Sequence, residues 1–192
     1  MKYLLVEDNL ELAKAVSSRL RLDGHVIDHA ANLADATAFS ETGEYDLILY
    51  DGVRPETMPR ANTAFIGTLP PGEAWAATAD RITRPLLIDW RRSHPVLSYV
   101  EFGEMLISQA IPLAIPQGGT SLIDAREGPI AAIAPREQFQ DVVVGFAILR
   151  TGEGGEPEWN TDWPLKRSFP TFWLNLIEFL AGHGEETGTV VH

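Results

Sequence analysis

Three short apolar runs in the first quarter of the chain alternate with segments of helical pattern. The runs cover residues 3–6, 25–30 and 47–50. Runs of this length are typical of buried strands. Between the first two, apolar residues recur at helical spacing from Asn9, a suitable N-cap, to Gly24, a suitable C-cap. Residues 34–39 predict a second, weaker helix. This order of elements, with short connections, predicts parallel strands joined by right-handed crossovers.

The rest of the chain is richer in prolines, glycines and short extended segments. Strands or extended segments are predicted at residues 63–67, 86–90, 107–115, 121–125, 130–134 and 141–149. The fourth and fifth of these flank a turn at Gly128 and predict a β-hairpin. Alanines in residues 73–83 permit a short helix, and residues 151–158 are a glycine-rich acidic loop. Phe169 begins a final amphipathic helix, and we expect residues 183–192 to form a disordered tail.

Charge and composition exclude several classes of partner and site. The net charge of −12 disfavours binding to nucleic acid or to an anionic membrane surface. The chain has no cysteine, which excludes disulfides, thiolate metal sites and a cysteine nucleophile. No signal-peptide pattern and no apolar run of about 18 residues is present, so we expect a cytoplasmic protein without a membrane partner.

Three carboxylates stand at the ends of predicted strands. Glu7 and Asp8 end the first strand, and Asp51 ends the third. If the strand order is 2-1-3, the first and third strands are neighbours and these acids converge at one sheet edge. Mg²⁺ suits such a cluster, and a carboxylate beside Mg²⁺ can attack a phosphoryl group to give an acyl phosphate. The alternative is that they are ordinary acids at the starts of helices, favoured by the helix dipole.

Residues 1–51 contain the motifs LLVEDN, LRLDGHVIDHAAN and EYDLILYD. In sequence and spacing they resemble the first half of a two-component response-regulator receiver domain. This resemblance implies that Glu7 and Asp8 hold Mg²⁺ and that Asp51 accepts phosphate, from a small donor or from a histidine kinase as partner.

Two further residues of the receiver family are not matched in the sequence. The family has a Thr or Ser after its fourth strand and a Lys after its fifth, which pairs with the phosphoryl oxygen and couples it to the switch. Spacing places the lysine position near Glu101, where a carboxylate would repel a phosphoryl group, and counting makes Thr78 the candidate hydroxyl. The resemblance therefore implies a metal site and a phosphoacceptor with impaired switching.

Residues from about 45 to 182 resemble a second family. The motifs are DGVRPETMPRANTAFIGTLPPG, DWRRSHPVLSYV, GPIAAIA, VVVGFAIL and NTDWPLKRSFPTFWLNLIEFLAG. They are similar to the C-terminal glutamine-amidotransferase-like domain of Bat-like, aerotolerance-type proteins that carry von Willebrand factor A domains. True amidotransferases use a Cys-His-Glu triad, whereas this chain has no cysteine and no serine elbow to replace it. The resemblance thus implies a fold without an activity, and we expect no enzyme.

The segment around residue 90 carries the most functional-looking polar residues of the second half. Arg91, Arg92 and His94 together can form an anion site. In the structural alternative, Trp90 packs, Asp89 pairs with an arginine and Pro95 ends the segment.

Both resemblances imply a flavodoxin-like α/β fold. We expect a three-layer sandwich, with a mainly parallel sheet, helices on both faces and a β-hairpin in the second half. Residues 1–182 are expected to form a single domain, with a receiver-like half (1–51) and an amidotransferase-like half (52–182). Such a mosaic can be a natural fusion, an engineered chimera or a designed sequence. Three functions follow: a receiver-like signalling module, a non-catalytic interaction domain of the amidotransferase-like class, or, ranked last because the sequence supplies no nucleophile, a hydrolase or transferase that uses His94.

Overall fold

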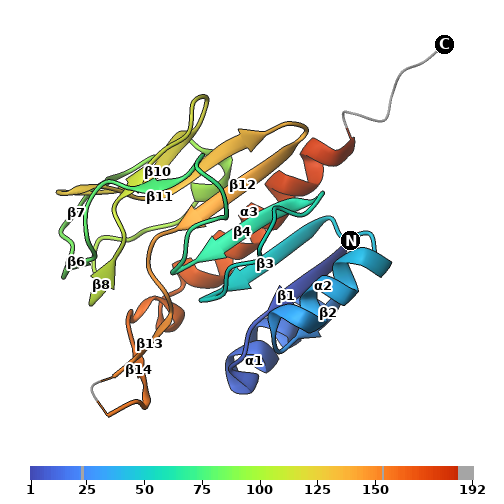
Figure 1. Ribbon diagram of the computed structural model, residues 1–192. Coiled ribbons are helices and arrows are strands. Elements are labelled where there is room, and N and C mark those ends of the chain that lie inside the picture. The colour runs from blue at the N-terminus through green and yellow to red at the C-terminus, as the bar shows by residue number, and fades with distance from the viewer. Residues whose placement is uncertain (23, 153, 186–192) are drawn as a thin grey trace.

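A computed structural model describes residues 1–22, 24–152 and 154–185. Within these residues, one sheet of eight strands has the order β2-β1-β3-β4-β12-β11-β10-β7. The strands are β1 (Lys2–Val6), β2 (Val26–Ala30), β3 (Leu47–Asp51), β4 (Asn62–Ile66), β7 (Leu87–Trp90), β10 (Thr120–Ala125), β11 (Gly128–Arg136) and β12 (Phe139–Val144). The α-helices are α1 (Leu10–Leu22), α2 (Leu33–Thr42) and α3 (Ser168–Glu185). Figure 1 shows strands of both halves of the chain side by side in this sheet.

Smaller elements surround the sheet. They are β5 (Ala76–Ala77) paired with β9 (Leu113–Ala114), β6 (Ile82–Thr83) with β8 (Gln109–Ala110), β13 (Leu149–Thr151) with β14 (Pro157–Trp159), and the 3-10 helices η1 (Pro95–Leu97) and η2 (Trp163–Leu165). The β13–β14 hairpin lies outside the main sheet, below the carboxyl ends of its parallel strands in Figure 1.

The first five strands of the order are parallel. β1 pairs with β2 and β3, β4 pairs with β3, and β12 completes this half by pairing with β4. All five residues of β3 are buried, as a strand covered on both faces requires. β11, β10 and β7 then continue the sheet with antiparallel pairing. The α/β class and the mainly parallel sheet predicted from the sequence are confirmed, as is the hairpin of β10 and β11.

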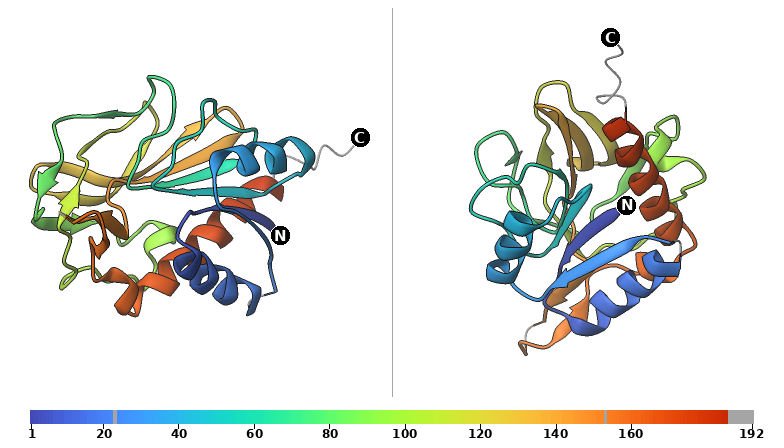
Figure 2. Two further views of the ribbon diagram at one scale, coloured as in Figure 1. Left: turned by 60° about the horizontal axis from the view of Figure 1, so that its bottom comes forward. Right: turned by 90° about the vertical axis from the view of Figure 1, so that its right-hand side faces the viewer.

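Alternate residues of the strands face two hydrophobic cores. Tyr3 and Leu5 of β1 belong to the core under α1 and α3, whereas Leu4 and Val6 belong to the core under α2. The left view of Figure 2 shows α1 and α3 on one face of the sheet and α2 on the other. The predicted three-layer arrangement, with helices on both faces, is therefore confirmed.

An aromatic cluster fixes α3 against the sheet. Trp163, of η2, is 1% exposed, and its indole Nε1 donates to Ser168 Oγ at 3.2 Å. Its ring contacts the rings of Phe102, Phe146, Phe169, Phe172 and Trp173. The side chain of Asn175 then binds the carbonyl oxygens of Val96 and Ser98, so α3 is also tied to η1. The start of α3 is thereby held in one position.

A buried ion pair links β4 and β12 at the amino end of the parallel strands. Asp141 of β12 is 2% exposed, and Arg136 Nε donates to its Oδ2 at 2.8 Å. Thr63 Oγ1 of β4 donates to Asp141 Oδ1 at 2.6 Å. Arg136 Nη2 also donates to the carbonyl of Ala61. Each carboxylate oxygen of Asp141 therefore has a partner, as a buried charge requires.

Several local expectations were wrong. Residues 73–83 form no helix but contain the short strands β5 and β6, because a short alanine segment gains too little from helix propensity alone. The strand predicted at 141–149 ends at Val144, and the chain turns away at Gly145. α3 continues through Glu185, three residues into the predicted tail, while the rest of that tail lies outside the described residues.

Candidate functional site

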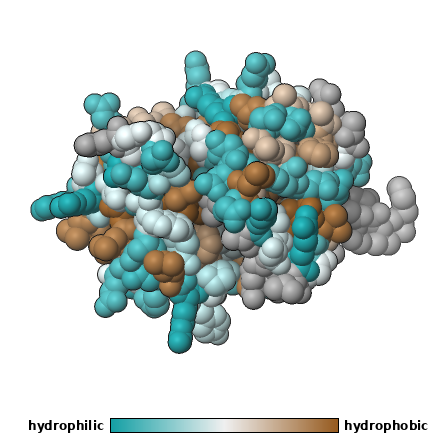
Figure 3. Space-filling view, turned by 90° about the horizontal axis from the view of Figure 1, so that it is seen from below, coloured by the Kyte–Doolittle hydropathy of each residue, from teal (hydrophilic) through white to brown (hydrophobic). Residues whose placement is uncertain are grey.

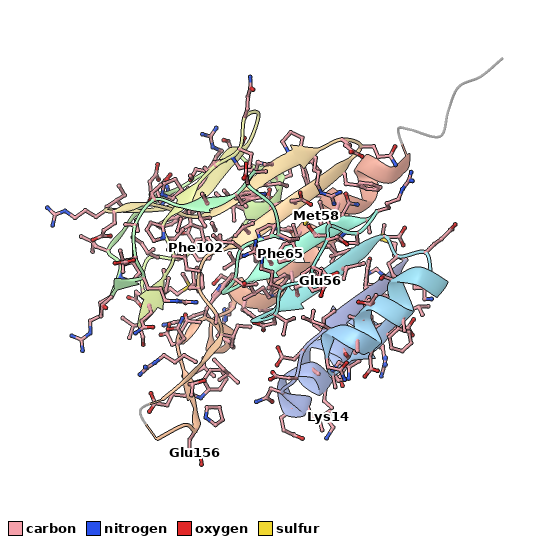
Figure 4. All side chains as sticks on the ribbon, in the orientation of Figure 1. Lys14, Glu56, Met58, Phe65, Phe102 and Glu156 are labelled. Atoms are coloured by element: carbon pink, nitrogen blue, oxygen red, sulfur yellow. The ribbon has the colours of Figure 1, made fainter. Side chains whose placement is uncertain are left out.

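A hollow of about 440 Å³ lies at the carboxyl ends of β1 and β3. Its lining includes Glu7, Asp8 and Asp51, together with Arg150 and Thr151 of β13. We call this hollow the acidic pocket. The sequence placed the three carboxylates at neighbouring strand ends, and the parallel pairing of β1 with β3 brings them together. Figure 4 shows the hairpin that carries Arg150, with Glu156 near its tip, extending from the lower part of the molecule.

Backbone contacts hold Glu7 in the acidic pocket. Glu7 N donates to the carbonyl of Ala30 at 3.1 Å, which extends the β1–β2 pairing by one residue. His29 Nε2 lies 2.8 Å from the carbonyl oxygen of Glu7. Asn9 N donates to Glu7 Oε1 at 2.7 Å, so the turn into α1 supports one carboxylate oxygen. The side chain of Glu7 is consequently fixed rather than free to move into solvent.

A glycine turn sets the position of Asp51. Gly52 has φ +67°, a conformation that residues with a Cβ rarely adopt, and its N–H donates to Ile66 O at 2.9 Å. The chain thus leaves the sheet directly after Asp51. This turn keeps the carboxyl group of Asp51 at the edge of the sheet, where the residue is 8% exposed.

Burial and mutual repulsion raise the pKa of two of the acids, Glu7 and Asp51. Burial, followed by the charges of Glu7 and Asp8, raises the pKa of Asp51 well above its usual range. Burial is also the main cause of the raised pKa of Glu7, which shares a hydrogen bond with Asp51. We call Glu7 and Asp51 the carboxyl pair. Because two adjacent buried carboxylates repel, the pair retains a proton more readily than two isolated acids do.

The surroundings of the carboxyl pair explain its desolvation. A void of about 10 Å³ lies behind the pair, on the α3 side of the sheet, and both acids line it. The other walls are apolar or aromatic and include Ile148, Phe169 and Trp173. The indole Nε1 of Trp173 is buried with no hydrogen-bond partner among the described residues. The pair therefore has an apolar wall on one side and the acidic pocket on the other.

The carboxyl pair does not form a ready-made metal site. Among the described residues, no group of three or more His, Cys, Asp or Glu side chains is arranged to hold a metal ion. Glu7 and Asp51 are directed at each other, while Asp8 is exposed at the rim. The donor chemistry still fits Mg²⁺, because it prefers oxygen ligands, binds through one or two carboxylates and keeps several waters.

The structure corrects the positions assigned to the receiver hydroxyl and lysine. The fifth parallel strand is β12, so the equivalent of the lysine follows Val144 and does not lie near Glu101, which lines a separate hollow beside the start of α3. The assignment of Thr78 as the receiver hydroxyl is also wrong. Its N–H donates to the carbonyl of Pro112, which places Thr78 beside β5 and not after β4. Thr68 is the hydroxyl residue that follows β4.

Arg150 is not among the site residues predicted from the sequence. It is the basic residue among the described side chains that line the acidic pocket. The glycines after it indicate a loop, whereas Leu149–Thr151 pairs with Pro157–Trp159 as the β13–β14 hairpin. The signal in the sequence was a basic residue shortly after the apolar run of β12. This signal points to the acidic pocket only when β12 is known to be the fifth parallel strand, because the sequence alone does not place β12 beside β4.

The proposed anion residues of the second half do not lie in the acidic pocket. Arg92 Nη1 is 3.5 Å from Asp89 Oδ1, and its guanidinium lies 3.9 Å from the ring centre of Trp90. His94 Nδ1 accepts from Val96 N at 3.3 Å and so caps η1. Arg91 is exposed in the same turn. These contacts match the structural alternative, in which Trp90 packs and Asp89 pairs with an arginine.

Exposed apolar side chains are scattered over the surface. The large exposed ones include Leu86, Ile88, Tyr99, Leu106 and Leu165. On the face shown in Figure 3, hydrophobic side chains form several small groups separated by hydrophilic ones. No α-helix of the described part of the chain is both long enough and apolar enough to cross a membrane.

Comparison with known proteins shows a shared fold. No family model matches the sequence, and no curated protein matches it significantly. One similar solved structure is Cytoplasmic Protein STM3548 from Salmonella typhimurium, with a TM-score of 0.60 and 11% identity over 93% of this chain and 98% of that chain. Another is Cytoplasmic Protein STM1381 from Salmonella typhimurium LT2, with a TM-score of 0.61 and 11% identity over 94% and 99%. At this identity the likeness extends to the fold alone.

Proposed function

We propose that the protein is a receiver-like signalling module in which Asp51 accepts a phosphoryl group. The observation that carries this proposal is the carboxyl pair, which joins the ends of two neighbouring parallel strands and opens onto the acidic pocket. Two buried carboxylates in contact destabilise the fold when both are charged, so their presence is best explained by a ligand that neutralises them. We propose that Glu7, Asp8 and Asp51 hold Mg²⁺, which when bound would offset their charge and that of a phosphoryl group.

The chemistry assigned to Asp51 is a phosphoryl transfer. A carboxylate oxygen of Asp51 attacks the phosphorus atom of a small phosphate donor or of a phosphohistidine. The bond from phosphorus to the donor breaks, the donor keeps the electron pair, and an acyl phosphate forms on Asp51. Asn9 N already donates to Glu7 Oε1, which orients Glu7 without using Asp51.

The output differs from that of an ordinary receiver. Gly145 follows β12 directly where the family has its lysine, so the usual coupling of phosphoryl oxygen to strand end is lost. We infer impaired switching, a histidine kinase or another signalling protein as partner, and no enzymatic turnover. The description of both structural neighbours as cytoplasmic proteins supports the same location for this chain.

A second candidate is a non-catalytic interaction domain of the amidotransferase-like class. It is favoured by the antiparallel strands β11, β10 and β7, which widen the sheet beyond what the receiver resemblance accounts for. The absence of cysteine from the sequence agrees with a domain that has lost amidotransferase chemistry.

Intact-mass spectrometry after incubation with acetyl phosphate and Mg²⁺ separates the two candidates. The receiver proposal predicts one phosphoryl group on the parent and none on Asp51→Asn. Asp46→Asn is the matched control, because Asp46 is an exposed aspartate at the other end of β3. An unmodified parent that circular dichroism shows to be folded would favour the interaction domain.

A further inference from the structure

Arg150 is placed to receive an anion in the acidic pocket. Arg150, on β13, lines the pocket together with the strand ends, and its Nη2 donates to Glu158 Oε2 of β14 at 2.6 Å. Its Nε is buried and has no hydrogen-bond partner among the described residues. A buried donor without a partner destabilises a protein unless a ligand satisfies it.

The contact with Glu158 leaves part of the guanidinium available. Glu158 occupies one Nη group, and its own side chain remains 49% exposed. Gly152 makes this arrangement possible, because a Cβ at that position would collide with the carboxylate of Glu158. An exposed pair of this kind contributes little to stability, so a stronger acceptor can replace Glu158. A guanidinium binds two oxygens of one phosphoryl group at once.

We propose that Arg150 is the anion-binding residue of the acidic pocket and takes the phosphoryl oxygens of a small phosphate ligand in place of Glu158. This deepens the proposed function, on which it rests for the presence of Mg²⁺ beside Glu7 and Asp51. A bound Mg²⁺ would neutralise the carboxylates at the strand ends, and Arg150 supplies positive charge from the hairpin. It thereby performs, from a different element, part of the role left open by the missing lysine.

Titration calorimetry with inorganic phosphate in the presence of Mg²⁺ tests this assignment. The parent is expected to bind phosphate. Arg150→Ala should weaken binding about tenfold or more, the effect of losing a charge-assisted bidentate contact. Arg150→Lys should restore part of the affinity, and Glu158→Gln should tighten binding because it removes the competing carboxylate. Arg92→Ala is the matched control, since Arg92 also pairs with an acid but lies outside the pocket.

Two results would overturn the assignment of Arg150. One is a parent protein that binds no phosphate; the other is equal affinity in the parent and in folded Arg150→Ala. Loss of binding in Arg92→Ala instead would move the anion site to the Arg91, Arg92 and His94 segment.

The acetyl phosphate assay on the same variants separates this inference from the proposed function. Phosphate binding that depends on Arg150, without an adduct on Asp51, would refute phosphoryl transfer and retain the anion site. An adduct that forms equally on the parent and on Arg150→Ala would retain phosphoryl transfer to Asp51 and refute the role of Arg150.

Discussion

Replacement of Asp51 by asparagine is expected to stabilise the metal-free protein at pH 8. At this pH the parent must either charge both Glu7 and Asp51 or keep a proton that the unfolded chain releases, because burial and the neighbouring carboxylates raise both pKa values. An asparagine side chain in place of Asp51 would remove one charge and could still donate a hydrogen bond to Glu7. Because Asp and Asn side chains have nearly the same volume, the substitution requires no repacking of the surroundings.

The magnitude follows from the repulsion within the carboxyl pair. Two unit charges about 4 Å apart repel by about 4 kcal/mol at an effective dielectric constant of about 20. Rearrangement of the hydrogen bonds offsets about 1 kcal/mol of this. The free energy of unfolding should therefore rise by about 1 to 3 kcal/mol at pH 8. For a chain of 192 residues, each kcal/mol corresponds to about 3 °C in Tm.

The pH dependence has a definite sign. Because the pKa of Asp51 and that of Glu7 are raised in the folded protein, the folded state keeps a proton that the unfolded chain releases above about pH 4. Stability from this proton is fully present below that pH and is lost as the pH rises through the folded pKa. The gain in stability from Asp51→Asn should thus be larger at pH 8 than at pH 5.

Urea denaturation at pH 5 and pH 8, with EDTA and then with Mg²⁺, measures these differences. Mg²⁺ should raise the stability of the parent and have little effect on Asp51→Asn. Asp80→Asn, in an exposed loop, controls for the change in net charge. A variant that is less stable than the parent at pH 8 without metal would refute the argument that the pair is repulsive.

Three further substitutions test the fold around the site. Asp141→Ala leaves the Arg136 charge without its partner and should reduce the free energy of unfolding by about 3 to 5 kcal/mol; a loss below about 1 kcal/mol by urea denaturation would contradict the buried network. Trp163→Ala empties the centre of the aromatic cluster and should cost about 3 to 5 kcal/mol by the same measurement, with α3 losing amide-exchange protection first. Gly52→Ala meets no neighbouring atom, so its expected cost of about 1 to 2 kcal/mol is that of the left-handed backbone alone; an unchanged Tm would contradict the strain.

The parallel half of the fold could be predicted in detail from local patterns. β1, β2 and β3 are short apolar runs separated by single helices, so their pairing follows from short connections and chain handedness. The convergence of Glu7 and Asp51 follows from the same pattern. Each of these inferences depends on residues that are close in sequence to the contact they make.

The remaining features depend on contacts between distant residues. β4 and β12 pair in parallel although residues 67–138 separate them, and no local pattern identifies that partnership. Counting along the chain therefore assigned the lysine position to Glu101 rather than to the segment after β12. Arg150 was missed for the same reason, because its place in the acidic pocket depends on that pairing.

An anomalous diffraction map from crystals soaked in Mn²⁺, a stand-in for Mg²⁺, would locate a bound cation directly. We expect one strong peak in the acidic pocket, about 2.0–2.3 Å from carboxylate oxygens of Glu7, Asp8 or Asp51, and no such peak in crystals of Asp51→Asn. An empty pocket in the parent, with Glu7 and Asp51 still in mutual contact, would contradict the assignment of these residues to a cation site.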